Sequence, residues 1–138
     1  FVIEANGRKV VLSGDCTFSE ELVQAGVGAD LTVHNVFAPS EELLNREPHK
    51  RQVAKGLASP EQAGEFFRQS GSRMGVFSHV INLDSTDEDI LLRARSVGYD
   101  GEIVLGADRM VLEVGDELRV QTPPPLDALQ DVTRRGQG

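Results

Sequence analysis

The sequence is poor in the residues that build disulfide scaffolds and metal clusters. Its 138 residues contain one cysteine, three histidines and no tryptophan. A lone cysteine, Cys16, forms no intramolecular disulfide and no thiolate zinc knuckle, which excludes a disulfide scaffold and a zinc finger. The three histidines, His34, His49 and His79, are too few to surround two metal ions by themselves. A self-contained dinuclear histidine site is therefore excluded.

Basic residues and long apolar runs are also scarce. The chain has 14 Lys and Arg against 22 Asp and Glu, a formal net charge of −8. Proteins that bind phosphate backbones or anionic lipids use clustered Lys and Arg, so this charge disfavours nucleic acid as a partner. The chain has no run of about 18 apolar residues, the length needed to span a bilayer. Its first residues also lack the basic, apolar and small-residue order of a signal peptide. We expect no membrane partner, and the cytoplasm is favoured over other compartments.

The remaining composition is that of one globular domain. The hydrophobic share is 39%, and the 14 glycines bring the apolar count near the usual value of about 45–50%. The chain begins without Met, inside a predicted strand, so we expect it to be part of a longer protein.

Short β-rich runs alternate with capped helical stretches along the chain. Asn6-Gly7 is a strong signal for a two-residue hairpin, so the first two strands are expected to be antiparallel neighbours. Helices are expected to begin at the capping signals Thr17–Glu20, Ser59–Gln62 and Ser85–Glu88. Residues 36–58 are expected to form a long surface loop and residues 123–138 a polar, Pro-rich tail. Strands are expected at residues 1–4, 9–13, 30–34, 74–79, 103–105, 110–114 and 118–120.

Polar residues follow three of these strands at their carboxyl ends. Asp15 comes after an apolar run, His34 and Asn35 end the next strand, and His79 ends a third. In α/β folds binding sites gather at such strand ends. A carboxylate can bridge two cations, and neutral imidazole is the commonest protein metal ligand, so Asp15 and His79 form the candidate pair.

Each candidate also has a purely structural interpretation. Asp15 could cap the following helix, and His79 could be a hydrogen-bonded residue at the edge of the core. His34 ends an apolar strand and suits a structural role, while Cys16 suits a small buried apolar one. The acidic residues near position 87 are explained by the dipole of a helix N-terminus. The fingerprints of nucleotide kinases, dinucleotide-binding dehydrogenases and serine hydrolases are absent.

Five segments in a fixed order resemble a known family. They are Gly7-Arg-Lys-Val-Val-Leu-Ser-Gly-Asp15, Gly28-Ala-Asp-Leu-Thr-Val-His34, Ser59-Pro-Glu-Gln-Ala-Gly64, Gly75-Val-Phe-Ser-His79 and Ile103-Val-Leu-Gly-Ala-Asp-Arg-Met-Val-Leu-Glu-Val114. Their order resembles the C-terminal half of the metallo-β-lactamase superfamily, nearest the ribonuclease Z and arylsulfatase-like branch. The resemblance covers residues 1–122 and implies an α/β (α+β) fold. That fold is half of an αβ/βα sandwich, a mixed β-sheet with about three outer helices and a C-terminal β-hairpin, with residues 36–58 as a variable loop.

The resemblance also implies a metal-dependent hydrolase. Asp15 and His79 would be metal ligands. His34, Asn35 and Cys16 would contact the ligands and not the metal, and no catalytic residue is expected beyond the ligands. Two divalent ions, expected to be zinc, would supply a hydroxide that cleaves an ester or phosphodiester-like bond. A catalytic zinc site needs at least three protein ligands, so this chain alone is expected to hold metal weakly or not at all and to be inactive.

Departures from the family pattern keep two alternatives open. The upstream His-x-His-x-Asp-His segment and one further histidine of the family are absent from the chain. Asn35 stands where the ribonuclease branch has a glutamate, and Leu57-Ala58 stands where that branch has a histidine. These losses make an RNA 3′-end processing nuclease the weaker alternative. The other alternative is a non-catalytic association module with the same fold.

The expected partners follow from the half-sandwich. Such a fold leaves an apolar sheet face that must be covered. We expect the missing N-terminal half or another copy of the chain, forming a homo-oligomer, to cover it, and a small molecule to be the substrate.

Overall fold

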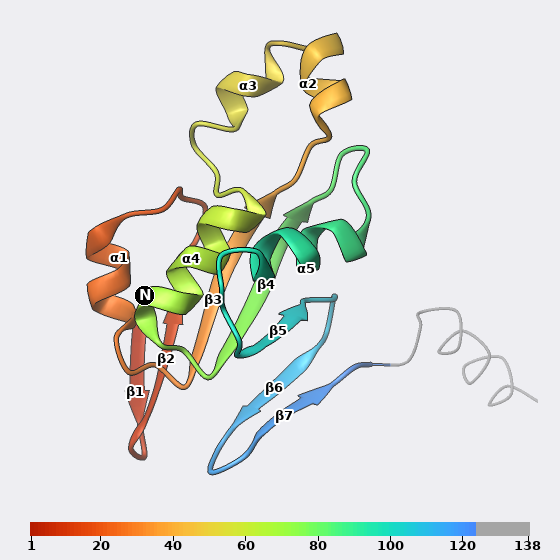
Figure 1. The fold of residues 1–138 in the computed structure, drawn as a ribbon. Coiled ribbons are helices and arrows are strands. Elements are labelled where there is room, and N and C mark those ends of the chain that lie inside the picture. The colour runs from red at the N-terminus through yellow and green to blue at the C-terminus, as the bar shows by residue number, and fades with distance from the viewer. Residues whose placement is uncertain (124–138) are drawn as a thin grey trace, which may run out of the picture. The chain divides into compact units, whose positions relative to one another are not determined.

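The computed structural model describes residues 1–123 and divides the chain into two compact units. Unit 1 is Phe1–Gly106, and unit 2 begins at Ala107 (Figure 1). The Pro-rich tail expected over residues 123–138 lies, beyond residue 123, outside the described residues. Unit 1 contains β1 (Val2–Ala5), β2 (Arg8–Leu12), α1 (Glu20–Gly26), β3 (Leu31–Phe37), α2 (Glu41–Arg46), α3 (Lys50–Val53), α4 (Pro60–Ser70), β4 (Met74–Ile81), α5 (Asp87–Arg95) and β5 (Glu102–Leu105).

The sheet of unit 1 is mixed, as the sequence predicts. Its strand order is β1-β2-β3-β4-β5, with β1 antiparallel to β2 and every other neighbouring pair parallel. Asn6 and Gly7 join β1 to β2 with φ angles of 51° and 72°, the left-handed values that a tight hairpin turn requires. Because β2, β3 and β4 are parallel, their carboxyl ends meet at one edge of the sheet.

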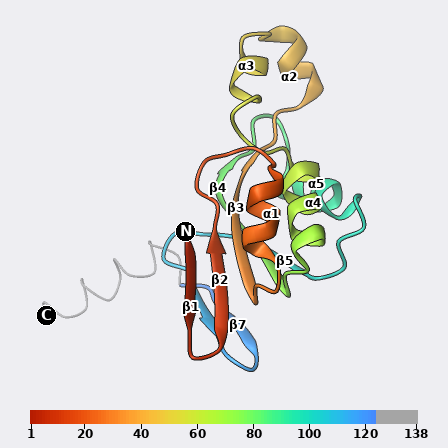
Figure 2. The same ribbon diagram turned by 90° about the vertical axis from the view of Figure 1, so that its left-hand side faces the viewer.

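Helices α1, α4 and α5 cover one face of this sheet (Figures 1 and 2). The core lies between them, where the ring of Phe67 in α4 is 5.4 Å from that of Phe77 and 5.6 Å from that of Tyr99. Gly75 of β4 must be glycine because a Cβ there would lie 2.4 Å from a ring carbon of Phe67. Burying each phenylalanine contributes about 1.5–3 kcal/mol, so this aromatic cluster is a main source of stability.

The three outer helices expected from the sequence are α1, α4 and α5, and the structure adds two more. Helices α2 and α3 occupy the segment expected to be a long loop and extend beyond the carboxyl ends of β3 and β4 (Figure 1). Leu43 and Leu44 of α2 are buried, and the Ser40 hydroxyl accepts a hydrogen bond from the Leu43 N–H at 3.0 Å. This cap and two apolar anchors are enough to fold one short helix.

Helix capping signals in the sequence place one helix start and miss two. The Ser59–Gln62 capping box of α4 is present, with Pro60 at the first helical position. In α1 the cap is Ser19, not Thr17, and in α5 it is Thr86, whose partner in the box is Asp89. Several adjacent hydroxyl residues make the choice of cap ambiguous from sequence alone.

Unit 2 contains the expected C-terminal hairpin. Strands β6 (Val111–Val114) and β7 (Leu118–Gln121) pair antiparallel, with Val111 opposite Gln121. The fold is thus the mixed α/β arrangement that the sequence predicts. No helix in the part of the chain that the structure describes is long and apolar enough to cross a membrane.

Candidate functional site at the carboxyl ends of β2, β3 and β4

The predicted site residues gather at one edge of the sheet of unit 1. Asp15 and Cys16 follow β2, His34 and Asn35 lie in β3, and His79 lies in β4. They form two groups of contacts. One joins Asp15 to His79, and the other joins Cys16 to the two β3 residues.

Asp15 and His79 form a carboxylate–imidazole pair. The Nδ1–H of His79 donates to Oδ1 of Asp15 at 2.8 Å, and the two side chains are 49% and 60% exposed, respectively. Within residues 1–123 neither side chain has another hydrogen bond or ion pair. Nε2 of His79 and the second oxygen of Asp15 therefore remain available to a ligand.

A β-bulge presents the His79 side chain. Asn35 of β3 is paired with Ser78 of β4, but the next residue, Val36, is paired with Val80, so His79 has no partner across the ladder. Its φ angle is 47°, a left-handed conformation that costs a residue other than glycine about 1–2 kcal/mol. Bulges are rare in parallel pairs and are often found beside binding sites, where they change the direction of a side chain.

The turn that carries Asp15 is attached to β3 on both sides. Before Asp15, the Ser13 N–H donates to the Val33 carbonyl at 2.9 Å. After Asp15, the Cys16 N–H donates to Oδ1 of Asn35 at 3.0 Å. Gly14 permits the turn between them with a φ angle of 69°. The carboxylate is thus held on a short segment that is fixed at its two ends.

His34 is a buried, neutral histidine. Burial lowers its pKa below the usual value, and its ring lies 5.3 Å from that of Phe66. Its Nδ1–H donates to the Asn35 carbonyl at 2.9 Å, because a carbonyl oxygen only accepts. This leaves the Nε2 lone pair facing Sγ of Cys16 at 3.9 Å. His34 therefore packs in the core and contacts the Asp15 turn through Cys16.

Asn35 contains an unsatisfied buried group. The residue is 2% exposed, and its Nδ2 has no hydrogen-bond partner in residues 1–123, although Oδ1 accepts from Cys16. Leaving such a donor unpaired costs about 1–3 kcal/mol. The Nδ2 group of Asn35 therefore lowers stability, while its Oδ1 makes a stabilising hydrogen bond.

The donor set at this edge suits part of a divalent-metal site. Carboxylate oxygen and neutral imidazole nitrogen are both ordinary zinc ligands. Within residues 1–123, however, no group of three or more His, Cys, Asp or Glu side chains could hold a metal ion. A metal ion at Asp15 and His79 would need further ligands from outside these residues.

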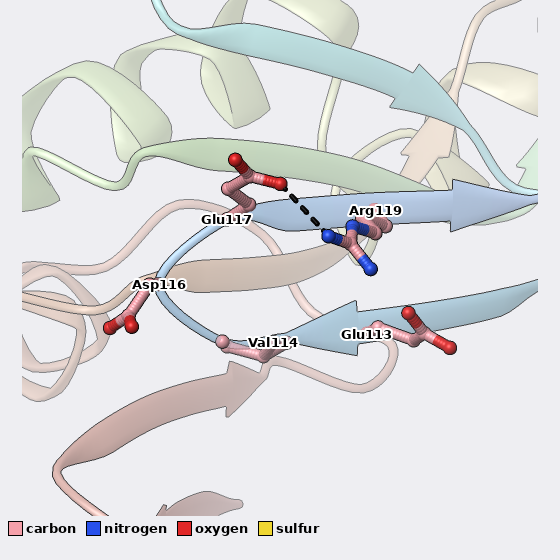
Figure 3. A pocket seen from close by; sticks show the side chains of 6 residues that line it. Glu113, Val114, Asp116, Glu117 and Arg119 are labelled. Carbon is pink, nitrogen blue, oxygen red and sulfur yellow. Dashed lines mark hydrogen bonds and ion pairs between the residues drawn. The ribbon is translucent and has the colours of Figure 1, made fainter.

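Other hollows and one further histidine do not involve this pair. His49 is exposed, with Nε2 3.7 Å from the Glu47 carboxylate. Leu57 lines a small cavity with Phe37 and Leu44. An open depression in the β6–β7 hairpin is lined by Glu113, Val114, Gly115, Asp116, Glu117 and Arg119, and Arg119 donates to Glu117 at 3.0 Å (Figure 3). None of the predicted site residues lines it.

Two features of the site have no signal in the sequence. The bulge at His79 depends on how two distant strands align, and the local sequence Val76-Phe-Ser-His-Val80 looks like a regular strand. The attachment of Cys16 to Asn35 joins residues that are 19 positions apart. The amide of Asn35 within an apolar strand is the one local sign that a polar contact is needed there.

Comparison with known sequences links the chain to ribonucleases. A scan against protein-family models finds no match. Ribonuclease Z of Myxococcus xanthus is 29% identical over 108 residues, which are 78% of this chain and 33% of that protein. The chain therefore spans about a third of the length of this curated relative.

This relationship corrects one expectation from composition. Disfavouring nucleic acid as a partner is wrong, because the curated relatives are by name enzymes that act on RNA. The net charge of −8 averages over the whole chain and does not describe the surface at one site. It also describes only a chain that matches about a third of the relative's length.

Solved structures show the same fold. The metallo-β-lactamase fold protein YhfI from Bacillus subtilis matches with a TM-score of 0.61 and 15% identity, over 76% of this chain and 39% of that one. The short form of human tRNase Z matches with a TM-score of 0.53 and 19% identity, over 83% and 37%. The resemblance seen in the sequence is thus confirmed: the chain has the fold of metallo-β-lactamase fold proteins, and its sequence is similar to part of ribonuclease Z.

Proposed function

We propose that the chain is the C-terminal part of a divalent-metal hydrolase that cleaves a phosphodiester bond in RNA, and that Asp15 and His79 are its metal ligands. The observation that carries the proposal is the exposed Asp15–His79 pair, held at 2.8 Å at the carboxyl edge of a parallel sheet. The ribonuclease Z relatives support RNA as the substrate class. The left-handed backbone of His79 supports a functional role, because strained residues cluster at active sites.

The pair is prepared to bind metal. Bound divalent ions, with zinc expected, would lower the pKa of a water molecule and polarise a phosphoryl oxygen. The Asp15 carboxylate accepts the Nδ1–H of His79, which fixes the tautomer with the Nε2 lone pair free. The bulge sets the direction in which the His79 side chain leaves the strand. Both side chains are exposed, so a large substrate can reach them.

Two departures from the family pattern, Asn35 and Leu57, cannot take part in proton transfer. Asn35 has an amide and Leu57 a hydrocarbon side chain, and neither gains or loses a proton near neutral pH. No general acid or base role therefore belongs to them. If the enzyme protonates its leaving oxygen with a side chain, that side chain lies elsewhere.

Zinc content and RNA cleavage of the full-length protein test the proposal. His79→Ala removes one ligand, so we expect bound zinc to fall and cleavage of an RNA with a 3′ extension to be lost. His49→Ala is the matched control, because His49 is also an exposed histidine but lies outside the pair. This control should keep the zinc content and the cleavage rate of the wild type.

Two outcomes contradict the proposal, and they differ in meaning. Full cleavage by His79→Ala would remove His79 from the metal site. A wild-type protein that neither holds zinc nor cleaves RNA would instead be the non-catalytic association module of the same fold.

A further inference from the structure

We infer that Asn35 is a positioning residue, whose side-chain oxygen sets the place of the Asp15 carboxylate relative to His79. The inference rests on the proposed metal site and goes further, because it assigns a role to a residue that binds neither metal nor substrate. It also explains why a buried side chain with an unpaired donor occupies this position.

The first step concerns the attachment of the Asp15 turn. Both peptide groups that flank this turn bond to β3, one through the Val33 carbonyl and the other through Oδ1 of Asn35. The first bond continues the β2–β3 ladder and needs no particular side chain. The second exists only because residue 35 has an acceptor of the right length. The amide therefore determines where the chain goes directly after Asp15.

The second step concerns the other member of the pair. His79 follows Ser78, and Ser78 is the residue paired with Asn35 across the β3–β4 ladder. The bulge begins directly after this pair. Asn35 thus bonds through its side chain to the residue after Asp15 and is paired through its backbone with the residue before His79. The two side chains that meet at 2.8 Å, Asp15 and His79, are thus each one residue away from a contact of Asn35.

The third step concerns the choice of an amide. A leucine of similar size would leave no unpaired Nδ2, but it would also offer no acceptor to Cys16. An aspartate would offer the acceptor, but it would bury a charge. Asparagine is the neutral side chain of this size that keeps the acceptor, and its cost is the orphaned donor. The hydrogen bond that places Cys16 therefore explains why position 35 is an asparagine, whereas a gain in stability does not.

The test compares Asn35→Leu, Asn35→Asp and the control Asn45→Leu in the full-length protein. Zinc alone is titrated into metal-free protein by calorimetry, and hydrogen exchange of the Cys16 amide is followed by NMR. We expect Asn35→Leu to bind zinc at least about 10-fold more weakly, which is usual when a residue that orients a metal ligand is lost. Its thermal midpoint should stay near that of the wild type, because the variant loses one acceptor and one orphaned donor.

The other variants show whether the acceptor is what matters. Asn35→Asp keeps an oxygen opposite the Cys16 N–H, so it should retain both zinc affinity and protection of that amide. Asn45 is an exposed residue of α2, and its replacement should change neither quantity. If Asn35→Asp does not fold, the comparison of Asn35→Leu with Asn45→Leu still tests the inference.

The outcomes separate this inference from the proposed function. Wild-type zinc affinity in a folded Asn35→Leu variant would overturn the inference and leave the metal site intact. If the wild type binds no zinc, the proposed function fails, and the metal-free NMR measurement decides the inference alone. In that case, loss of Cys16 protection and of the His79 Nδ1–H signal in Asn35→Leu supports it, and retention of both overturns it.

Discussion

The two ends of the sheet in unit 1 each carry an aspartate, and the two aspartates are used differently. Asp30, at the amino end of β3, accepts from the Lys9 N–H at 2.9 Å, from Arg73 at 2.9 Å and from Arg8 at 3.4 Å. Its side chain is 12% exposed. Asp15, at the carboxyl end of β2, is 60% exposed, and its single partner within the described residues 1–123 is His79.

The difference teaches how to tell a carboxylate whose oxygens are satisfied within the fold from one that can still accept a ligand. Asp30 accepts from three donors, and its contacts join β2, β3 and the start of β4. Among residues 1–123, Asp15 has one partner and a second carboxylate oxygen without one. A carboxylate held in place but left partly unsatisfied is the one suited to a metal ion.

The largest expected effect comes from replacing each of the two carboxylates in turn. Asp15→Asn should lower RNA cleavage by the full-length protein by more than about 100-fold. That is more than is usual for a residue that only contacts a ligand, because Asp15 is itself a proposed ligand. Asp30→Asn should leave cleavage nearly unchanged but lower the free energy of unfolding by about 2 kcal/mol, since it weakens charge-assisted hydrogen bonds. Cleavage assays and urea unfolding measure the two effects. Equal loss of cleavage in both variants would remove the distinction.

A smaller effect is expected in the pH dependence of stability. The Lys9 N–H, followed by Arg73 and Arg8, holds the pKa of Asp30 below its ordinary value despite the opposing effect of burial. A carboxyl with a lowered folded pKa contributes stability above its unfolded pKa of about 3.9 and loses it as the pH falls through the folded value. Urea unfolding between about pH 5 and 2 should show this loss, and Asp30→Asn should show a flatter curve. Identical slopes would mean that Asp30 is not paired in solution.

The smallest effect is expected at the bulge. His79→Asn replaces a strained residue with one that adopts left-handed φ angles more readily. We expect the free energy of unfolding to rise by about 1 kcal/mol or less, while zinc binding falls. A thermal melt and a zinc titration on the same sample measure both. A clear loss of stability would show that the Asp15–His79 contact contributes more than the backbone strain costs.

Much of the fold could be predicted because its signals are local. The Asn6-Gly7 turn, the Ser59–Gln62 capping box and the apolar runs each act within a few residues, and the structure contains all of them. The two short helices α2 and α3 could not be predicted. Helix α2 has only two buried side chains, Leu43 and Leu44, and α3 has none. Pro48 interrupts the periodic pattern between them.

The contact between Asp15 and His79 was predictable, but its detailed geometry was not. Asp15 and His79 stand at strand ends, and parallel strands bring such ends together whatever the details of packing. The roles of Asn35 and Cys16 depend on a contact across 19 positions, and the bulge depends on the alignment of β3 with β4. These features are fixed by tertiary structure, which no local pattern contains.

The bulge has a consequence for how this site could be gained or lost. Val80 packs against the core that contains Phe77, although in a regular strand residues three apart point to opposite faces. His79 is the extra residue that makes this possible. If it were deleted, Ser78 and Val80 would become neighbours and would pair with Asn35 and Val36 in an unbroken ladder. The proposed ligand is therefore a single-residue insertion in β4, and one codon separates the strand with the imidazole from the same strand without it.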